Sequence, residues 1–185
     1  MSTLLVLGGA RSGKSRYAES LGKGQKFYVA TAEASDEEMV QRIAAHRVQR
    51  GPSWETFEVP LDLVTALQTI DGKGRFVLID CLTIWLSNLM IVKLDVTRET
   101  EMLCETLKKT KAKVVLVSNE VGLGVVPANA VARAFRDAQG FLNQRVAEAV
   151  DEVIFMAAGL PLTLKKAERK PPPGKAKKSS RSRKA

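Results

Sequence analysis

Residues 8–15 carry the strongest chemical signal in the sequence. They read Gly-Gly-Ala-Arg-Ser-Gly-Lys-Ser and match the pattern G-x-x-x-x-G-K-[ST] of a phosphate-binding loop, placed between an apolar run and a helical pattern. Backbone N–H groups of such a loop point at phosphate oxygens, and the following helix adds the positive end of its dipole. The predicted nucleotide site is therefore Gly8, Gly9, Ala10, Arg11, Ser12, Gly13, Lys14 and Ser15.

Two members of this loop have predicted chemical roles. Lys14 is expected to reach the β- and γ-phosphates, and the hydroxyl of Ser15 to bind Mg²⁺. The pattern differs from G-x-G-x-x-G, which argues against a dinucleotide site. Because the loop contacts only the phosphates of a nucleotide, the motif does not distinguish ATP from GTP.

Two acids end apolar runs where an open α/β sheet holds its ligands. Asp80 follows residues 76–79, and Glu120 follows residues 114–119. We expect one of them to hold Mg²⁺ through water, with Asp80 preferred beside Ser15, and the other to orient or deprotonate a nucleophile, a possible acid/base role for Glu120. The alternative is that both acids simply face water at strand ends.

His46 is the only histidine of the chain. It lies in a helical pattern over residues 36–50, with Arg42 and Arg50 four residues away on either side and therefore on the same face. Two guanidinium groups could cradle a phosphate and disfavour the imidazolium form. A helix-edge histidine is more often a surface or packing residue, and the spacing alone leaves both interpretations open.

These residues need an alternating α/β framework to bring them together. Near-continuous apolar runs, typical of strands covered on both faces, occur at 4–7, 27–31, 76–80, 114–118 and 153–157. Helical patterns occur at 14–21, 36–50, 61–70, 83–91, 98–109 and 130–150. This order predicts a three-layer α/β fold with a mostly parallel sheet.

Composition and charge set the boundaries of that domain. The chain has 185 residues, 45% hydrophobic and 26% charged, with a formal charge of +9. Residues 165–185 contain ten Lys or Arg and one acid, so residues 1–164 are balanced and show no basic patch in the sequence. We predict a folded domain over 1–164 and a disordered basic tail over 165–185, which could contact polyanions weakly.

The sequence also predicts the compartment in which the protein works. No apolar run is long enough to span a membrane, and the amino terminus lacks the basic region of a signal peptide. Cys81 and Cys104 show no zinc-site spacing. We therefore expect a cytoplasmic protein.

Several longer motifs occur in collinear order around these residues. They are 8–19, 28–31 (Tyr-Val-Ala-Thr), 36–50, 79–89 (Ile-Asp-Cys-Leu-Thr-Ile-Trp-Leu-Ser-Asn-Leu), 117–127, 135–144 and 159–161 (Gly-Leu-Pro). Together they resemble the bifunctional adenosylcobinamide kinase/adenosylcobinamide-phosphate guanylyltransferases of cobalamin biosynthesis, over about residues 3–164.

The resemblance implies a RecA-like P-loop fold and two reactions. A nucleoside triphosphate, ATP or GTP, phosphorylates adenosylcobinamide; GTP then guanylylates a histidine, and GMP passes to adenosylcobinamide phosphate. His46 matches that histidine. Positions that contact GTP in the family match Thr31, Ala32, Glu33, Arg47, Val48, Gln49, Arg50, Glu58 and Asp80. The resemblance also implies Mg²⁺ and a homotrimer, and it leaves the basic tail unexplained.

Two rival functions stay open on the sequence. The first is a P-loop small-molecule kinase in which His46 is only structural. The second is a nucleic-acid-dependent RecA-like ATPase that grips its polymer with the basic tail, against which the balanced charge of residues 1–164 argues.

Overall fold

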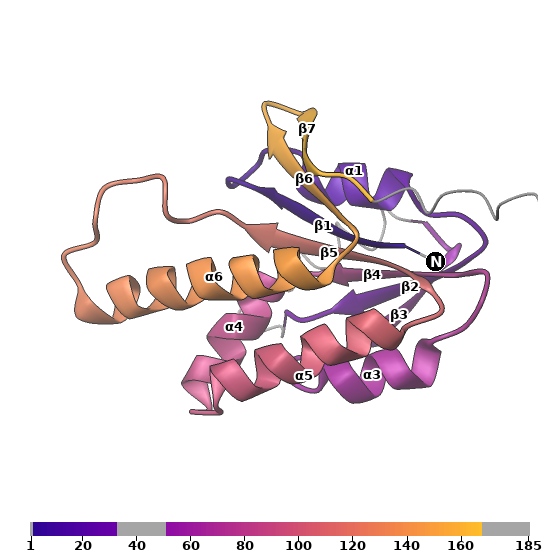
Figure 1. The fold of residues 1–185 in the computed structure, drawn as a ribbon, viewed down its shortest axis with the longest axis horizontal. Helices are drawn as coiled ribbons and strands as arrows, with labels where there is room; N and C mark the ends of the chain where they lie inside the picture. Colours follow the sequence, from indigo (N-terminus) through magenta and orange to yellow (C-terminus); the bar gives the residue numbers. More distant parts are fainter. Residues whose placement is uncertain (1, 33–50, 168–185) are drawn as a thin grey trace, which may run out of the picture.

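A seven-stranded sheet forms the centre of the molecule. The computed structural model describes residues 2–32 and 51–167. The strands lie in the order β3-β2-β4-β5-β1-β6-β7, and only β7 is antiparallel to its neighbour (Figure 1). Their bounds are β1 Thr3–Gly8, β2 Gln25–Ala30, β3 Trp54–Glu58, β4 Arg75–Asp80, β5 Lys113–Asn119, β6 Glu152–Ala157 and β7 Leu160–Lys165.

Helices cover both faces of this sheet and make three layers. The described helices are α1 Lys14–Ser20, α3 Leu63–Ile70, α4 Leu82–Ile91, α5 Val96–Lys109 and α6 Ala130–Ala149. Helix α1 lies on one face, and α3, α5 and α6 lie on the other (Figure 1). The strands alternate their side chains between two hydrophobic clusters, so Leu5 and Val77 face α3–α6 while Val6 and Phe76 face α1.

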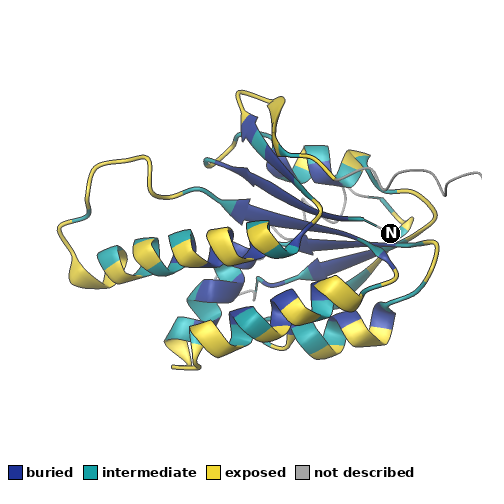
Figure 2. Cartoon of the chain, in the orientation of Figure 1, coloured by how far each residue is buried: buried dark blue, intermediate teal, exposed yellow. Residues whose placement is uncertain are grey.

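Burial on both faces explains the composition of the strands. Figure 2 shows the central strands as the most buried part of the fold, and all six residues of β1 are buried. Strands buried on both faces need apolar residues at nearly every position, and the sequence shows such near-continuous apolar runs. The predicted three-layer, mostly parallel α/β fold is confirmed.

The five predicted strands are all present, and two further strands were not predicted. Both lie at the edges of the sheet: β3 has the partly exposed sequence Trp-Glu-Thr-Phe-Glu, and β7 contains Pro161, which an edge strand tolerates. The helix predicted over residues 36–50 lies outside the described residues. Strand β7 runs to Lys165, one residue beyond the predicted end of the folded domain.

Apart from its two edge strands, the sheet has two borders at which the parallel strands begin or finish, and these borders hold different residues. Strands β1, β2, β4, β5 and β6 all end at one edge, which we call the carboxyl edge, and begin at the other, the amino edge. The phosphate loop and Asp80 lie at the carboxyl edge. Because β7 runs antiparallel to β6, Lys165 pairs with Val153 and the chain returns to the amino edge. Among the described helices, none is both long and apolar enough to cross a membrane.

Candidate nucleotide site

The phosphate loop follows β1 and opens directly into α1. Gly8, Arg11 and Gly13 all have positive φ angles, of 152°, 55° and 94°, which curl the backbone between the strand and the helix. At Gly8 an added Cβ would lie 2.4 Å from the carbonyl oxygen of Met156, so only glycine fits there. The loop therefore has the shape that the sequence motif predicts.

Two buried polar groups in the loop are prepared for an anion. Lys14 is 7% exposed, and its ammonium group donates to the Gly9 carbonyl at 2.6 Å. Burial lowers the pKa of Lys14, partly opposed by the neighbouring Cys81 and Asp80. The hydroxyl of Ser12 is buried and has no hydrogen-bond partner among residues 2–32 and 51–167. A phosphate would accept from the Ser12 hydroxyl and would balance the buried charge of Lys14, whose only hydrogen bond among the described residues goes to the neutral Gly9 carbonyl.

The turn between β6 and β7 braces this loop from the side. The backbone N–H of Gly159 donates to the Ser12 carbonyl at 3.0 Å. A Cβ built on Gly13 would lie 3.4 Å from the Cα of Gly159, so the two backbones nearly touch. The sequence alone predicts no role for Gly159, and the only signal in it is the Gly-Leu-Pro motif at residues 159–161. In the structure its φ is positive, at 81°.

Asp80 ends β4 beside the loop, as predicted. Tyr28, two positions before the paired residue Ala30 on β2, donates its hydroxyl to Asp80 Oδ2 at 3.1 Å. The side chain of Tyr28 is 5% exposed, and its ring packs edge-on against Trp54. Tyr28 thus fixes one oxygen of the Asp80 carboxylate, a role that the sequence analysis did not assign.

The oxygen groups present fit a magnesium ion held mainly by its nucleotide. Ser15 lies in the first turn of α1, and the Asp80 carboxylate lies close enough to Lys14 to act on its pKa. The described residues contain no cluster of three or more His, Cys, Asp or Glu that could hold a metal. One hydroxyl and one carboxylate, completed by phosphates and water, are a usual donor set for Mg²⁺.

Cys81, the next residue, does not supply a nucleophile. Burial and the adjacent Asp80 charge raise the pKa of the Cys81 thiol to about 11. The thiol therefore stays protonated at neutral pH, and a thiol is a weak nucleophile.

Thr31 and Glu58 also reach the carboxyl edge. The hydroxyl of Thr31 donates to the Cys81 carbonyl at 2.8 Å and accepts from the Cys81 N–H at 2.9 Å, which ties the end of β2 to the end of β4. Asn88 donates to the Thr31 carbonyl at 2.9 Å. Ala32 follows Thr31, and Glu58 pairs with Ala30. The structure thus brings Thr31, Ala32, Glu58 and Asp80 together, and their contact with GTP remains a prediction.

Glu120 lies next to the loop but binds its own turn. Its backbone N–H donates to the Gly8 carbonyl at 3.0 Å, and its carboxylate accepts from the Gly122 N–H at 2.6 Å. The preceding Asn119 is held by Asn143, which donates to the Asn119 carbonyl at 3.0 Å. The acid/base role predicted for Glu120 remains a prediction.

The other predicted site residues lie outside the described residues. These are Glu33, His46, Arg47, Val48, Gln49 and Arg50.

The sequence matches one family over almost the whole fold. The profile described as "Cobinamide kinase / cobinamide phosphate guanyltransferase" (CobU) matches residues 4–164. The chain belongs to this family. It is 47% identical over 168 residues to the Bifunctional adenosylcobalamin biosynthesis protein CobP of Pseudomonas aeruginosa, covering 87% of this chain and 96% of that protein. The Salmonella typhimurium CobU is 37% identical, with 88% and 99% covered.

Solved structures that resemble this family member show the fold. A type III secretion system ATPase from pathogenic bacteria superposes with a TM-score of 0.51 and 12% identity, covering 88% of this chain and 56% of that one. A Pyrococcus horikoshii OT3 protein, PH0250, gives a TM-score of 0.50 and 10% identity, covering 91% and 88%. At this identity the likeness supports the P-loop NTPase fold and says nothing of substrates.

Proposed function

We propose that this protein phosphorylates adenosylcobinamide and then transfers GMP to adenosylcobinamide phosphate. The family match over residues 4–164, around a complete phosphate loop, carries the proposal. The CobP and CobU relatives are named bifunctional adenosylcobalamin biosynthesis proteins, and this chain spans nearly all of their length. We expect it to work in the cytoplasm as a homotrimer.

The phosphorylation step needs only the geometry at the carboxyl edge. The substrate hydroxyl oxygen attacks the γ-phosphorus and forms a new P–O bond, while the bond to the β,γ-bridging oxygen breaks and the nucleoside diphosphate leaves. The hydroxyl proton passes to a base, for which we propose Glu120. Lys14 and the N–H groups of the loop bind the triphosphate oxygens, while Asp80 and Ser15 would hold Mg²⁺. Bound there, Mg²⁺ supplies positive charge that stabilises the phosphates. Both ATP and GTP fit this role, since the loop contacts only phosphates.

The guanylyl transfer needs a nucleophile, for which we propose His46. A ring nitrogen attacks the α-phosphorus of GTP, the bond to the bridging oxygen breaks, and pyrophosphate leaves. A phosphate oxygen of adenosylcobinamide phosphate then attacks the same phosphorus and displaces the imidazole. We expect Glu33, Arg47, Val48, Gln49, Arg50, Glu58, Thr31 and Ala32 to contact the nucleotide. The protonated thiol of Cys81 leaves the site without a competing sulfur nucleophile.

One experiment separates this function from a plain kinase. Wild-type protein is incubated with α-labelled GTP and Mg²⁺, denatured, and examined for retained label beside a His46→Ala variant. We expect an acid-labile, alkali-resistant adduct in the wild type and none in the variant, with phosphorylation of adenosylcobinamide retained by both. Absence of an adduct from the wild type would leave the small-molecule kinase, and an adduct in His46→Ala would place the nucleophile elsewhere.

A further inference from the structure

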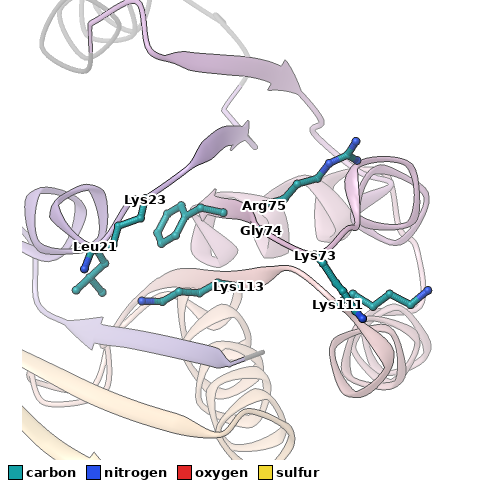
Figure 3. Close-up of a pocket in the computed structure, with 8 residues that line it drawn as sticks. Leu21, Lys23, Lys73, Gly74, Arg75, Lys111 and Lys113 are labelled. Carbon is teal, nitrogen blue, oxygen red and sulfur yellow. The ribbon is translucent and has the colours of Figure 1, made fainter.

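A shallow hollow of about 400 Å³ lies at the amino edge of the sheet, opposite the phosphate loop (Figure 3). Five of the eight residues that line it are Lys or Arg, and none is acidic. This cluster is not visible in the sequence, because its members are scattered through a part of the chain whose total charge is balanced.

The parallel sheet explains how these cations meet. Lys73 precedes β4, Lys111 precedes β5, Lys113 begins β5, and Lys23 follows α1. Strands β4 and β5 are neighbours, with Phe76 opposite Lys113. Neighbouring strands lie about 4.8 Å apart, so the connections that enter them bring their lysines to one place.

Four of the five cations are available to a ligand. Arg75 donates to the carbonyls of Ile70 and Asp71, and its guanidinium lies over the Phe27 ring, turned away from the others (Figure 3). Lys23, Lys73 and Lys111 are exposed, and no carboxylate of the described residues pairs with them. The ammonium group of Lys113 lies 5.7 Å from the centre of the Phe76 ring, a contact that leaves its charge unneutralised.

Asp71 is the acidic residue nearest to the lysines of the hollow along the chain, and its carboxylate is already hydrogen-bonded to other groups. Asp71 Oδ1 accepts hydrogen bonds from Thr110 Oγ1 at 2.7 Å, from the Lys111 N–H at 2.7 Å and from the Ala112 N–H at 2.8 Å. This carboxylate oxygen therefore holds the connection between α5 and β5 in place. It positions Lys111 through the backbone and forms no ion pair with the lysine side chain.

We propose that the basic hollow, Lys23, Lys73, Lys111 and Lys113, binds the phosphate chain of a small molecule, inorganic or nucleoside-borne. Lys23 and Lys113 lie on one side of the hollow and Lys73 and Lys111 on the other (Figure 3). Two separated pairs of positive charges suit an anion with several linked phosphates better than a single phosphate. Ammonium groups bind phosphate as point charges and impose little geometry, which suits a flexible chain.

A nucleic acid fits the hollow less well. Proteins that hold single strands combine basic grooves with exposed aromatic rings on which bases stack. Phe76 is 1% exposed beneath Lys113, and the hollow has no other aromatic residue. The site is also separate from the nucleotide site of the proposed reactions, because strand β4, six residues and about 20 Å long, spans the distance between the two edges.

The test measures binding of tripolyphosphate by calorimetry to the full chain carrying Lys14→Ala, which weakens the phosphate loop. We expect one remaining site, weakened roughly 25-fold by Lys73→Ala/Lys111→Ala, since each ammonium contact near water contributes about fivefold. Lys23→Ala/Lys113→Ala should act similarly. The matched control, Lys93→Ala/Arg98→Ala, removes two exposed charges near the start of the 14-residue helix α5, whereas Lys111 follows its end, and should change nothing. ATP in place of tripolyphosphate tests whether a nucleoside is accepted.

Three outcomes would overturn the proposal. Binding that is absent, or equal in the hollow and control variants, would mean that no site exists there or that the basic tail holds the anion. Selective binding of a twelve-residue oligothymidylate, with none of tripolyphosphate, would make the hollow a nucleic-acid site. If Lys14→Ala does not fold, the wild type is titrated instead, and the hollow variants should lower the number of bound tripolyphosphates from two to one.

Discussion

Replacing Tyr28 by Phe removes a hydroxyl that donates to Asp80 at 3.1 Å and keeps the ring that packs on Trp54. A hydrogen bond to a charged acceptor contributes about 1.5–3 kcal/mol, and this distance favours the lower figure. If the bond orients Asp80 toward Mg²⁺, its loss should lower kcat/KM about tenfold. Stability should fall by about 1.5 kcal/mol or less, since the half-buried Asp80 can bind water instead.

The assay follows phosphorylation of adenosylcobinamide over a range of Mg²⁺ concentrations. We expect Tyr28→Phe to need more Mg²⁺ for half-maximal rate, while its melting temperature stays close to that of the wild type. Tyr17→Phe, a partly buried tyrosine of α1, is the matched control. An unchanged Mg²⁺ dependence in Tyr28→Phe would refute the view that Tyr28 positions a metal-binding carboxylate.

Three further outcomes are expected. Lys14→Ala should abolish phosphorylation and guanylyl transfer together, measured in separate assays; near-normal guanylyl transfer would indicate a second nucleotide site. Burial raises the pKa of Asp71, but hydrogen bonds from Thr110 and the following backbone outweigh it and hold the pKa below its usual value. The stability that Asp71 contributes is therefore present above about pH 4 and lost as the pH falls through the lowered pKa. Asp71→Ala should cost about 2–3 kcal/mol in urea unfolding at pH 7 and progressively less as the pH is lowered below about 4, and a cost that does not change with pH would contradict this. Deleting residues 168–185 should leave the melting temperature and GTP turnover unchanged. Deleting 165–185 should lower the free energy of unfolding by about 1–3 kcal/mol, because Lys165 donates to the carbonyls of Ala147, Glu148 and Val150. Equal melting temperatures of the two truncations would show that Lys165 contributes nothing.

The sequence predicts the interior of this fold better than its margins. The buried strands β1, β4 and β5 are read from unbroken apolar runs, because burial on both faces permits little else. Strand β3 escapes prediction because its Trp-Glu-Thr-Phe-Glu sequence belongs to a half-exposed edge. Strand β7 escapes prediction because Gly159, just before it, and Pro161, within it, usually indicate a turn.

In the candidate site, the local features could be predicted from the sequence and the contacts between distant residues could not. The phosphate loop and Asp80 are local signals, a motif and a strand end, and the structure has both where they are expected. The hydrogen bond from Tyr28 to Asp80 and the brace from Gly159 to Ser12 join residues 52 and 147 positions apart, so they depend on strand order. The basic hollow depends on it too, which is why the balanced charge of residues 1–164 concealed it.

The antiparallel course of β7 has a practical consequence for handling the protein. This strand carries the chain from the turn beside the phosphate loop back to the amino edge, where Lys165 ends it. A purification tag or a surface linker joined directly after Ala167, in place of residues 168–185, would therefore start from the edge opposite the nucleotide site. Protein immobilised through a linker at this position should present the phosphate loop to solution, which suits surface-based measurements of nucleotide and corrinoid binding.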